Sequence, residues 1–142
     1  MDAGLSYRET AVAGASPVRL VILLYQQAIE DLRRALQALA RGDIESRTRE
    51  VDHALQVIGH LRATLDLERG GIVAHNLGRF YAQVIRGLME AQCQQSAAVL
   101  EQQIANLMLV CDAWCDLERS VSSEPKSSKN QNDPRRPLDW RA

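Results

Sequence analysis

Aromatic residues are scarce in this sequence, because tryptophan, tyrosine and phenylalanine together make up 4% of its 142 residues. A core must therefore be built mainly from aliphatic side chains, and 46% of the residues are hydrophobic, which is enough for one. An excess of positive charge is also missing, since the formal net charge is −1 at pH 7. Nucleic-acid-binding domains usually carry a strongly basic surface, so this charge balance argues against that class.

Long apolar runs are missing as well. No run reaches the roughly 20 apolar residues that a membrane-spanning helix needs. The start of the chain, from Met1 to Leu5, has neither the basic region nor the apolar stretch of a signal peptide. We therefore expect a cytoplasmic protein without membrane insertion, whose length allows one domain with a core of its own.

Cysteines are few, and Cys93, Cys111 and Cys115 form no even set for a disulfide framework. Cys111 and Cys115 are four residues apart, so both could lie on one helix face, but no further ligands follow at the spacing of a zinc site. Buried free thiols are the favoured interpretation. Glu50 and His53 form one Glu-x-x-His pair, whereas a di-metal bundle needs two. We expect no metal and no cofactor.

Catalytic motifs are also absent from the sequence. Gly70-Gly71 is not part of a phosphate-binding loop, and no serine or cysteine stands in a nucleophile motif. We therefore expect no enzyme and no catalytic residue. The alternative is a histidine phosphotransfer four-helix bundle that uses His75, with Gly78 nearby. The lysine expected beside such a histidine is missing, and Arg79 replaces it poorly.

What the sequence does contain is the apolar periodicity of α-helices. Ser16 and Pro17 are typical of a helix start, and Gly42 is typical of a helix end. Asp43 and Ser96 can each cap a further helix. The predicted helices cover residues 17–41, 44–69, 72–92 and 97–119.

Two glycines lie inside the third predicted helix. Gly78 and Gly87 each cost about 1 kcal/mol relative to alanine at a helix interior. This cost suggests that a neighbouring backbone approaches closely at both positions.

The connections between the predicted helices are short, so successive helices should pack antiparallel. We predict an all-α fold, an antiparallel up-down four-helix bundle over residues 16–119. Residues 1–15 form an irregular N-terminal arm in this prediction. Residues 120–142 are polar and lack periodicity, and we expect a disordered C-terminal tail.

Two segments are more apolar than one helix face requires. Leu20 to Leu24 are five apolar residues in a row, and the run from Leu107 to Cys111 is similar. A third helix of the bundle could cover the additional side chains. If it does not, they form a groove for amphipathic partner helices. The sequence leaves both interpretations open.

Several elements of the sequence occur in an order that matches one known family. These are Tyr7, Ala15-Ser16-Pro17 with Leu20, Leu24-Tyr25 with Ala28, Ala54, Ile58, Leu61, Leu65-Asp66 with Gly70-Gly71, Asn76-Leu77 with Tyr81, and Trp114. Together with the helix lengths, they resemble the FliS family of flagellin-specific export chaperones. One departure is Gln26, where the family commonly has an acidic residue.

The resemblance implies a cytoplasmic chaperone that binds the disordered C-terminal region of flagellin, one chaperone to one flagellin. It would prevent premature polymerisation and keep flagellin competent for type III export while the flagellum is assembled. The resemblance implies no cofactor. It leaves open a contact with the flagellar export gate and a homodimer of the free protein.

The resemblance and the apolar excess together predict a flagellin-binding groove. Its predicted residues are Leu20, Leu24, Tyr25, Ile58, Leu61, Leu65, Leu77, Tyr81, Met108 and Trp114. Tyr25 and Trp114 also lie on inner helix seams, so a core position stays open for them. In the family the N-terminal arm can cover part of the groove, and Leu5 and Tyr7 match that arm.

Overall fold

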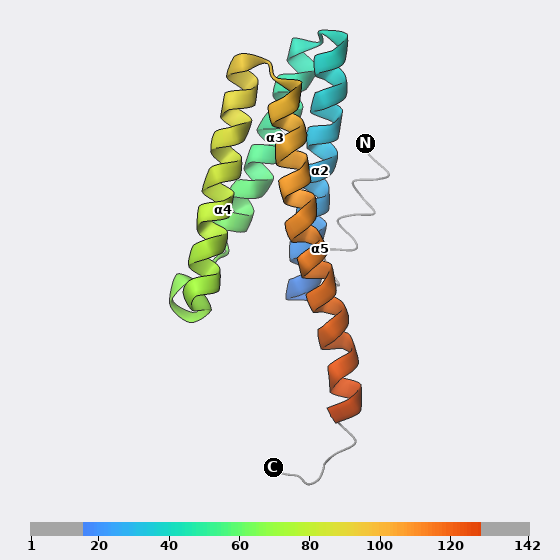
Figure 1. Cartoon of the computed structure of the whole chain (residues 1–142), viewed down its shortest axis with the longest axis vertical. Coiled ribbons are helices and arrows are strands. Elements are labelled where there is room, and N and C mark those ends of the chain that lie inside the picture. The colour runs from blue at the N-terminus through green and yellow to red at the C-terminus, as the bar shows by residue number, and fades with distance from the viewer. Residues whose placement is uncertain (1–15, 129–142) are drawn as a thin grey trace. The chain divides into compact units, whose positions relative to one another are not determined.

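The computed structural model describes the backbone of residues 16–128 and the side chains of residues 16–121 (Figure 1). The predicted arm, with Leu5 and Tyr7, lies outside the described residues, as do residues 129–142. The described residues form four helices and no strand. They are α2 (Pro17–Arg41), α3 (Ile44–Ala63), α4 (Leu67–Gln94) and α5 (Ala97–Ser128).

The chain divides into two compact units, Met1–Cys111 and Asp112–Ala142. In the first unit α3 packs against both α2 and α4. Figure 1 shows that α2 and α4 begin at one end of this unit, whereas α3 and α5 begin at the other. The predicted all-α, up-down four-helix architecture is confirmed. Among the described residues, no helix combines the length and the apolar character needed to cross a membrane.

The first helix has the predicted ends. The Ser16 hydroxyl oxygen accepts a hydrogen bond from the Arg19 amide at 3.1 Å, and Pro17 follows as the first helical residue. Gly42 ends the helix at φ 73°, in the left-handed region that favours glycine. Asp43 then caps α3, since its side chain accepts from the Ser46 amide at 3.1 Å.

The second predicted helix ends earlier than expected. Gly70-Gly71 was the expected end, but α3 ends at Ala63, where the Thr64 hydroxyl donates to the Leu61 carbonyl oxygen at 2.8 Å. Asp66 then caps α4 by accepting from the Arg69 amide at 3.1 Å. Local side-chain hydrogen bonds thus end one helix and begin the next before the glycines are reached.

The third predicted helix begins at a break inside α4. Gly71 has φ 57° and ψ −136°, so residues 67–70 form a short turn and the regular helix resumes at Ile72. Of the two helix-interior glycines, Gly87 has a close neighbour, but that neighbour is a side chain and not the predicted backbone. A Cβ atom there would lie 2.4 Å from Nε2 of Gln103 on α5. Gly78 does not, because its nearest neighbour would be Leu65 Cδ1 at an ordinary 3.6 Å.

The fourth helix begins as predicted and ends later. The Ser96 hydroxyl oxygen accepts from the Val99 amide at 3.1 Å, which caps the start of α5. The predicted tail begins at residue 120, but α5 continues to Ser128. No glycine or asparagine follows Arg119 before Ser128, so the change in composition carries no residue typical of a C-cap.

The core is mainly aliphatic, as the composition predicts. The largest fully buried hydrophobic side chains are Tyr25, Tyr81, Ile22, Leu32, Ile58, Leu61, Leu88, Leu100, Leu107, Val51 and Val84. Two large hydrophobic residues near helix starts are exposed, Ile44 and Val73. Both lie in the first turn of regular helix, where there is little neighbouring structure to cover a side chain.

Candidate functional site

A pair of buried tyrosines joins α2 to α4 through the core. The Tyr25 hydroxyl donates to the Tyr81 hydroxyl oxygen at 2.9 Å, and the two ring centroids are 6.1 Å apart. Both side chains are at most 1% exposed. Burial raises the pKa of Tyr81, and the hydrogen bond from Tyr25 lowers it by less. The Tyr81 hydroxyl therefore stays protonated at neutral pH, and the pair is a fixed polar link in an apolar interior.

This pair separates a sealed part of the bundle from a half-exposed part. On the C-terminal side of each tyrosine, Leu32 on α2 and Val84 and Leu88 on α4 are fully buried. On the N-terminal side, Ile22 of α2 is also fully buried, but most of the other large apolar residues of both helices are half-buried or exposed. We call the following set the apolar end: Leu20, Leu23 and Leu24 of α2, Leu65 of the connection between α3 and α4, and Leu77 and Phe80 of α4.

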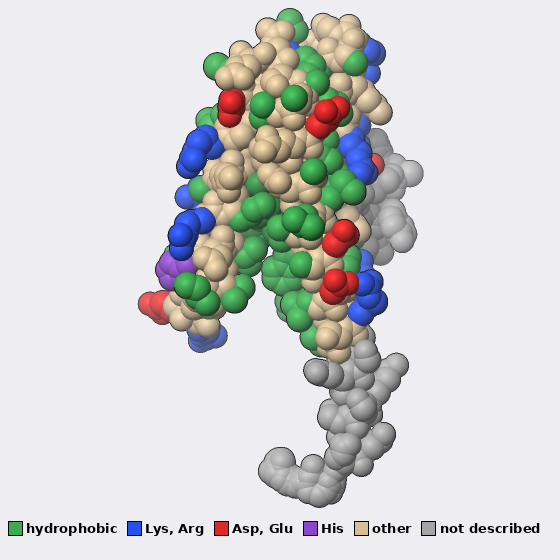
Figure 2. All heavy atoms as spheres, in the orientation of Figure 1, with side chains coloured by type: hydrophobic (Ala, Val, Ile, Leu, Met, Phe, Trp, Pro, Cys, Tyr) green, Lys and Arg blue, Asp and Glu red, His purple; other side chains and the backbone are tan. Residues whose placement is uncertain are grey.

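Local structure explains how α4 and the connection contribute to the apolar end. Leu65 lies against α4, since its Cδ1 atom is 3.6 Å from where a Cβ of Gly78 would be. Phe80 lies beside the tyrosine pair, with its ring centroid 5.8 Å from that of Tyr81. In Figure 2, hydrophobic side chains gather in a hollow beside the N-terminal half of α4. Leu67, Ile72 and further side chains near the start of α4 are exposed as well.

The structure divides the predicted groove residues into two sets. Tyr25, Ile58, Leu61 and Tyr81 are at most 2% exposed, so they belong to the core and offer no surface to a ligand in this structure. The placement of these four on the groove surface is therefore corrected.

The other predicted groove residues are at least partly accessible. Leu20, Leu24, Leu65 and Leu77 all lie in the apolar end. Met108 on α5 is 40% exposed, and its sulfur accepts a hydrogen bond from the Arg33 guanidinium at 3.3 Å. Trp114 is half-buried and belongs to the second unit, which is described by itself.

Two residues of the apolar end were not among the predicted groove residues. Leu23 and Phe80 are half-buried beside the predicted set. The signal for Leu23 was its place in the apolar run from Leu20 to Leu24, which no single helix face can bury. Phe80 precedes Tyr81, and periodicity alone did not decide which of the two faces the core.

A polar cluster ties α2 to α3 away from the apolar end. The fully buried Asp31 accepts from Gln27 at 2.8 Å and pairs with Arg34 at 2.7 Å. His53 Nδ1 of α3 lies 2.5 Å from the second oxygen of Asp31. Burial raises the pKa of Asp31, while hydrogen bonds from His53 and Gln27 lower it in part. Glu50 pairs with Arg34 at 3.2 Å, so Glu50 and His53 serve this cluster.

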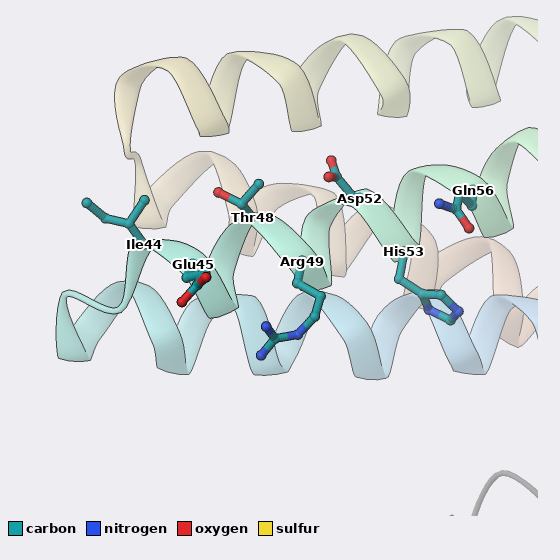
Figure 3. Close-up of a pocket in the computed structure, with 7 residues that line it drawn as sticks. All are labelled: Ile44, Glu45, Thr48, Arg49, Asp52, His53 and Gln56. Carbon is teal, nitrogen blue, oxygen red and sulfur yellow. The ribbon is translucent and has the colours of Figure 1, made fainter. Parts of the chain in front are cut away.

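His53 also borders a shallow groove on the outer face of α3 (Figure 3). The groove is lined by Ile44, Glu45, Thr48, Arg49, Asp52, His53 and Gln56. Its charged side chains are of both signs and come from one helix, which is typical of a solvated helix face. Within the described residues, no group of three His, Cys, Asp or Glu side chains is placed to hold a metal ion.

His75, the residue of the alternative function, has a local role at the break in α4. Its Nδ1 atom donates to the Gly71 carbonyl oxygen at 2.9 Å, and the side chain is otherwise exposed. This contact helps to satisfy a carbonyl group where the helix is interrupted. Neither this geometry nor the comparisons below support a phosphotransfer function.

Comparisons with known proteins point to one family. The family model described as "Flagellar protein FliS" matches residues 2–121. The flagellar secretion chaperone FliSB of Pseudomonas aeruginosa is 38% identical over 106 residues, which cover 75% of this chain and 84% of the relative. The flagellar secretion chaperone FliS of Salmonella typhimurium is 33% identical over 115 residues, covering 80% and 85%.

A more distant relative extends the match. The flagellar secretion chaperone FliS of Bacillus subtilis is 26% identical over 121 residues, covering 85% of this chain and 87% of the relative. These proteins are secretion chaperones and not enzymes. The chain belongs to the FliS family of flagellar secretion chaperones.

Proposed function

We propose that this protein is a cytoplasmic chaperone that binds the disordered C-terminal region of flagellin, one chaperone to one flagellin. The proposal is carried by the apolar end, where Leu20, Leu24, Leu65 and Leu77 are half-buried beside a sealed core. Flagellin bound there would be kept from premature polymerisation and kept competent for export. We also propose Met108 as a groove residue, and Trp114 of the second unit as a flagellin contact of its own.

The chemistry of the apolar end suits an amphipathic helix. Ordering a disordered segment costs on the order of 2–5 kcal/mol or more, which apolar contact must offset. Burial contributes roughly 25 cal/mol per Å² of apolar surface. A helix with apolar residues at i, i+3, i+4 and i+7 could lie along the leucines of α2 and α4. The same apolar face of flagellin would then be unavailable for contacts with other flagellin copies.

The N-terminal arm is part of the proposal. Leu5 and Tyr7 are apolar or aromatic residues in the segment that directly precedes α2. We propose that they cover part of the apolar end until flagellin displaces them. Deletion of the arm tests this step.

Titration calorimetry tests the proposed ligand. The probe is a peptide of the last roughly 40 residues of flagellin from the same organism, titrated into the full chain. We expect one-to-one binding with a large negative heat-capacity change, because apolar surface is buried on coupled folding. A wild-type protein that binds no such peptide would contradict the proposed function.

A matched pair of leucine variants tests the place of binding. Leu24→Ala removes apolar surface from the apolar end, whereas Leu109→Ala removes it from a side chain that is 72% exposed on α5. We expect Leu24→Ala to weaken peptide binding about tenfold, the size of a moderate interface contribution, and Leu109→Ala to leave it unchanged. Unfolding curves of both variants confirm that they are folded. Equal affinities of the two variants would place the ligand elsewhere.

A further inference from the structure

The tyrosine pair stands at the border of the apolar end. Leu24 directly precedes Tyr25, and Leu77 lies about one helical turn before Tyr81. The other large, fully buried side chains of the core are almost all aliphatic. Besides the contacts of the buried Asp31, the tyrosine pair is thus one of few directional polar contacts in this interior, and most of the half-buried apolar residues of α2 and α4 precede it.

The geometry of the pair limits how far α2 and α4 can move. α3 packs against both helices, and the hydroxyl-to-hydroxyl hydrogen bond of 2.9 Å joins them directly. A tyrosine ring is rigid and has only two side-chain torsions, so two rings that are tilted against each other and joined at their hydroxyls constrain the distance between the helices. Aliphatic side chains pack without preferred directions and fill space that neighbours leave. An aliphatic pair could let the half-exposed ends of α2 and α4 shift toward each other.

We propose that the Tyr25–Tyr81 pair is a strut that holds α2 and α4 at the spacing at which the apolar end accepts its ligand. Tyr25 and Tyr81 are thus positioning residues, which act through Leu24 and Leu77 and do not touch the ligand. This inference rests on the proposed function. Its closing experiment separates the two, because the wild-type protein tests the function and the tyrosine variants test the strut.

The variants are Tyr25→Phe, Tyr81→Phe and the double variant, with Leu88→Val as the matched control. Each variant removes the hydrogen bond between the two hydroxyls while both rings stay in place, and the double variant removes both hydroxyls. Leu88 is fully buried in the sealed part, about two turns beyond Tyr81, so Leu88→Val lowers stability without touching the strut. Urea unfolding gives the stability of each variant, and calorimetry with the flagellin peptide gives its affinity.

We expect peptide affinity to fall when the tyrosine pair is changed, and not merely because a variant is less stable. The double variant should bind the peptide roughly three- to tenfold more weakly than wild type, the range of one lost hydrogen bond. Leu88→Val should lose stability and bind like wild type. Wild-type affinity in the double variant would overturn the strut. An affinity loss that follows stability in every variant, Leu88→Val included, would overturn it as well.

A measurement without ligand covers the case in which wild type does not bind the peptide. That result contradicts the proposed function, and amide hydrogen exchange of the free protein then decides on the strut. We expect faster exchange in residues 17–24 and 72–80 of the double variant, with residues 84–91 unchanged, because only the half-exposed ends lose their spacer. Exchange that is unchanged in both helix ends would overturn the inference.

Discussion

At the scale of single residues, Asp31 is the most constrained charged group that the structure describes. Its side chain is fully buried, and burial is the largest influence on its pKa, which it raises above the usual 3.8. Hydrogen bonds from His53 and Gln27 and the charges of His53 and Arg34 lower that pKa in part. The folded protein therefore holds the Asp31 proton more tightly than the unfolded chain does. The resulting contribution to stability is present below pH 3.8 and is lost as the pH rises through the raised pKa.

This linkage predicts a difference between two aspartate variants. Asp31→Asn removes the titrating group, so its unfolding free energy should lack the decrease that Asp31 contributes to wild type above about pH 4. Asp52→Asn, an exposed aspartate on α3, should keep the wild-type slope in that range. Urea unfolding at a series of pH values from about 3 to 7 measures both slopes. Identical slopes in the two variants would show that Asp31 ionises as it does in the unfolded chain.

Residues with local roles were predictable, and residues with distant partners were not. Ser16, Gly42 and Asp43 act within their own helix ends, so residue type and spacing were sufficient. The hydrogen bond between Tyr25 and Tyr81 joins residues that are 56 positions apart. Helical periodicity places each tyrosine on an apolar face, but it contains no information on which residue of another helix lies opposite.

At the scale of helices, the break at Gly71 shapes the start of α4. Its φ of 57° and ψ of −136° are accessible to glycine and strained for other residues, and a Cβ atom there would meet nothing within 4 Å. Gly71→Ala should therefore lower the free energy of unfolding by about 1–3 kcal/mol through backbone strain alone. Gly59→Ala is the control, because Gly59 lies inside α3 with open space around its Cβ position. It should raise stability by up to about 1 kcal/mol.

Chemical unfolding of the two glycine variants measures this contrast. A change of the same sign and size in both would mean that the break in α4 straightens at little cost in the alanine variant. The same glycine pair is the reason that the sequence predicted the third helix to begin at Ile72. Two consecutive glycines are typical of a helix end, and the sequence does not show that Asp66 caps one further turn in front of them.

At the scale of the whole molecule, the up-down architecture followed from helix lengths and short connections, but the site followed only in part. The apolar run from Leu20 to Leu24 indicated more apolar surface than one helix face can bury. Whether a given side chain is covered depends on how four helices are placed, which periodicity does not describe. Ile58 and Leu61 are thus sealed in the core, whereas Leu65, only one turn further on, is half-exposed where the helix has already ended.

The proposed role of the N-terminal arm is also a property of the whole molecule. Residues 1–15 are joined to α2 at Ser16, about one turn before Leu20, so the arm is tethered beside the apolar end. Fifteen residues can span up to roughly 50 Å when extended, so every residue of the apolar end is within reach. A tethered segment competes with a free ligand at a high effective concentration. If the arm covers the apolar end as proposed, it lowers the apparent affinity for flagellin by the fraction of molecules that are covered.

Deleting residues 1–14 should expose the apolar end and strengthen binding of the flagellin peptide. We expect a gain of a few-fold in affinity, corresponding to the removed competition, together with more fluorescence of an apolar dye in the free protein. A full-length variant with Leu5→Ser and Tyr7→Ser is the matched control, since it keeps the length of the arm and removes its apolar side chains. It should behave like the deletion if those two residues do the covering. If neither variant changes affinity or dye binding, the arm does not cover the apolar end, and the half-buried leucines of α2 and α4 are open to flagellin at all times.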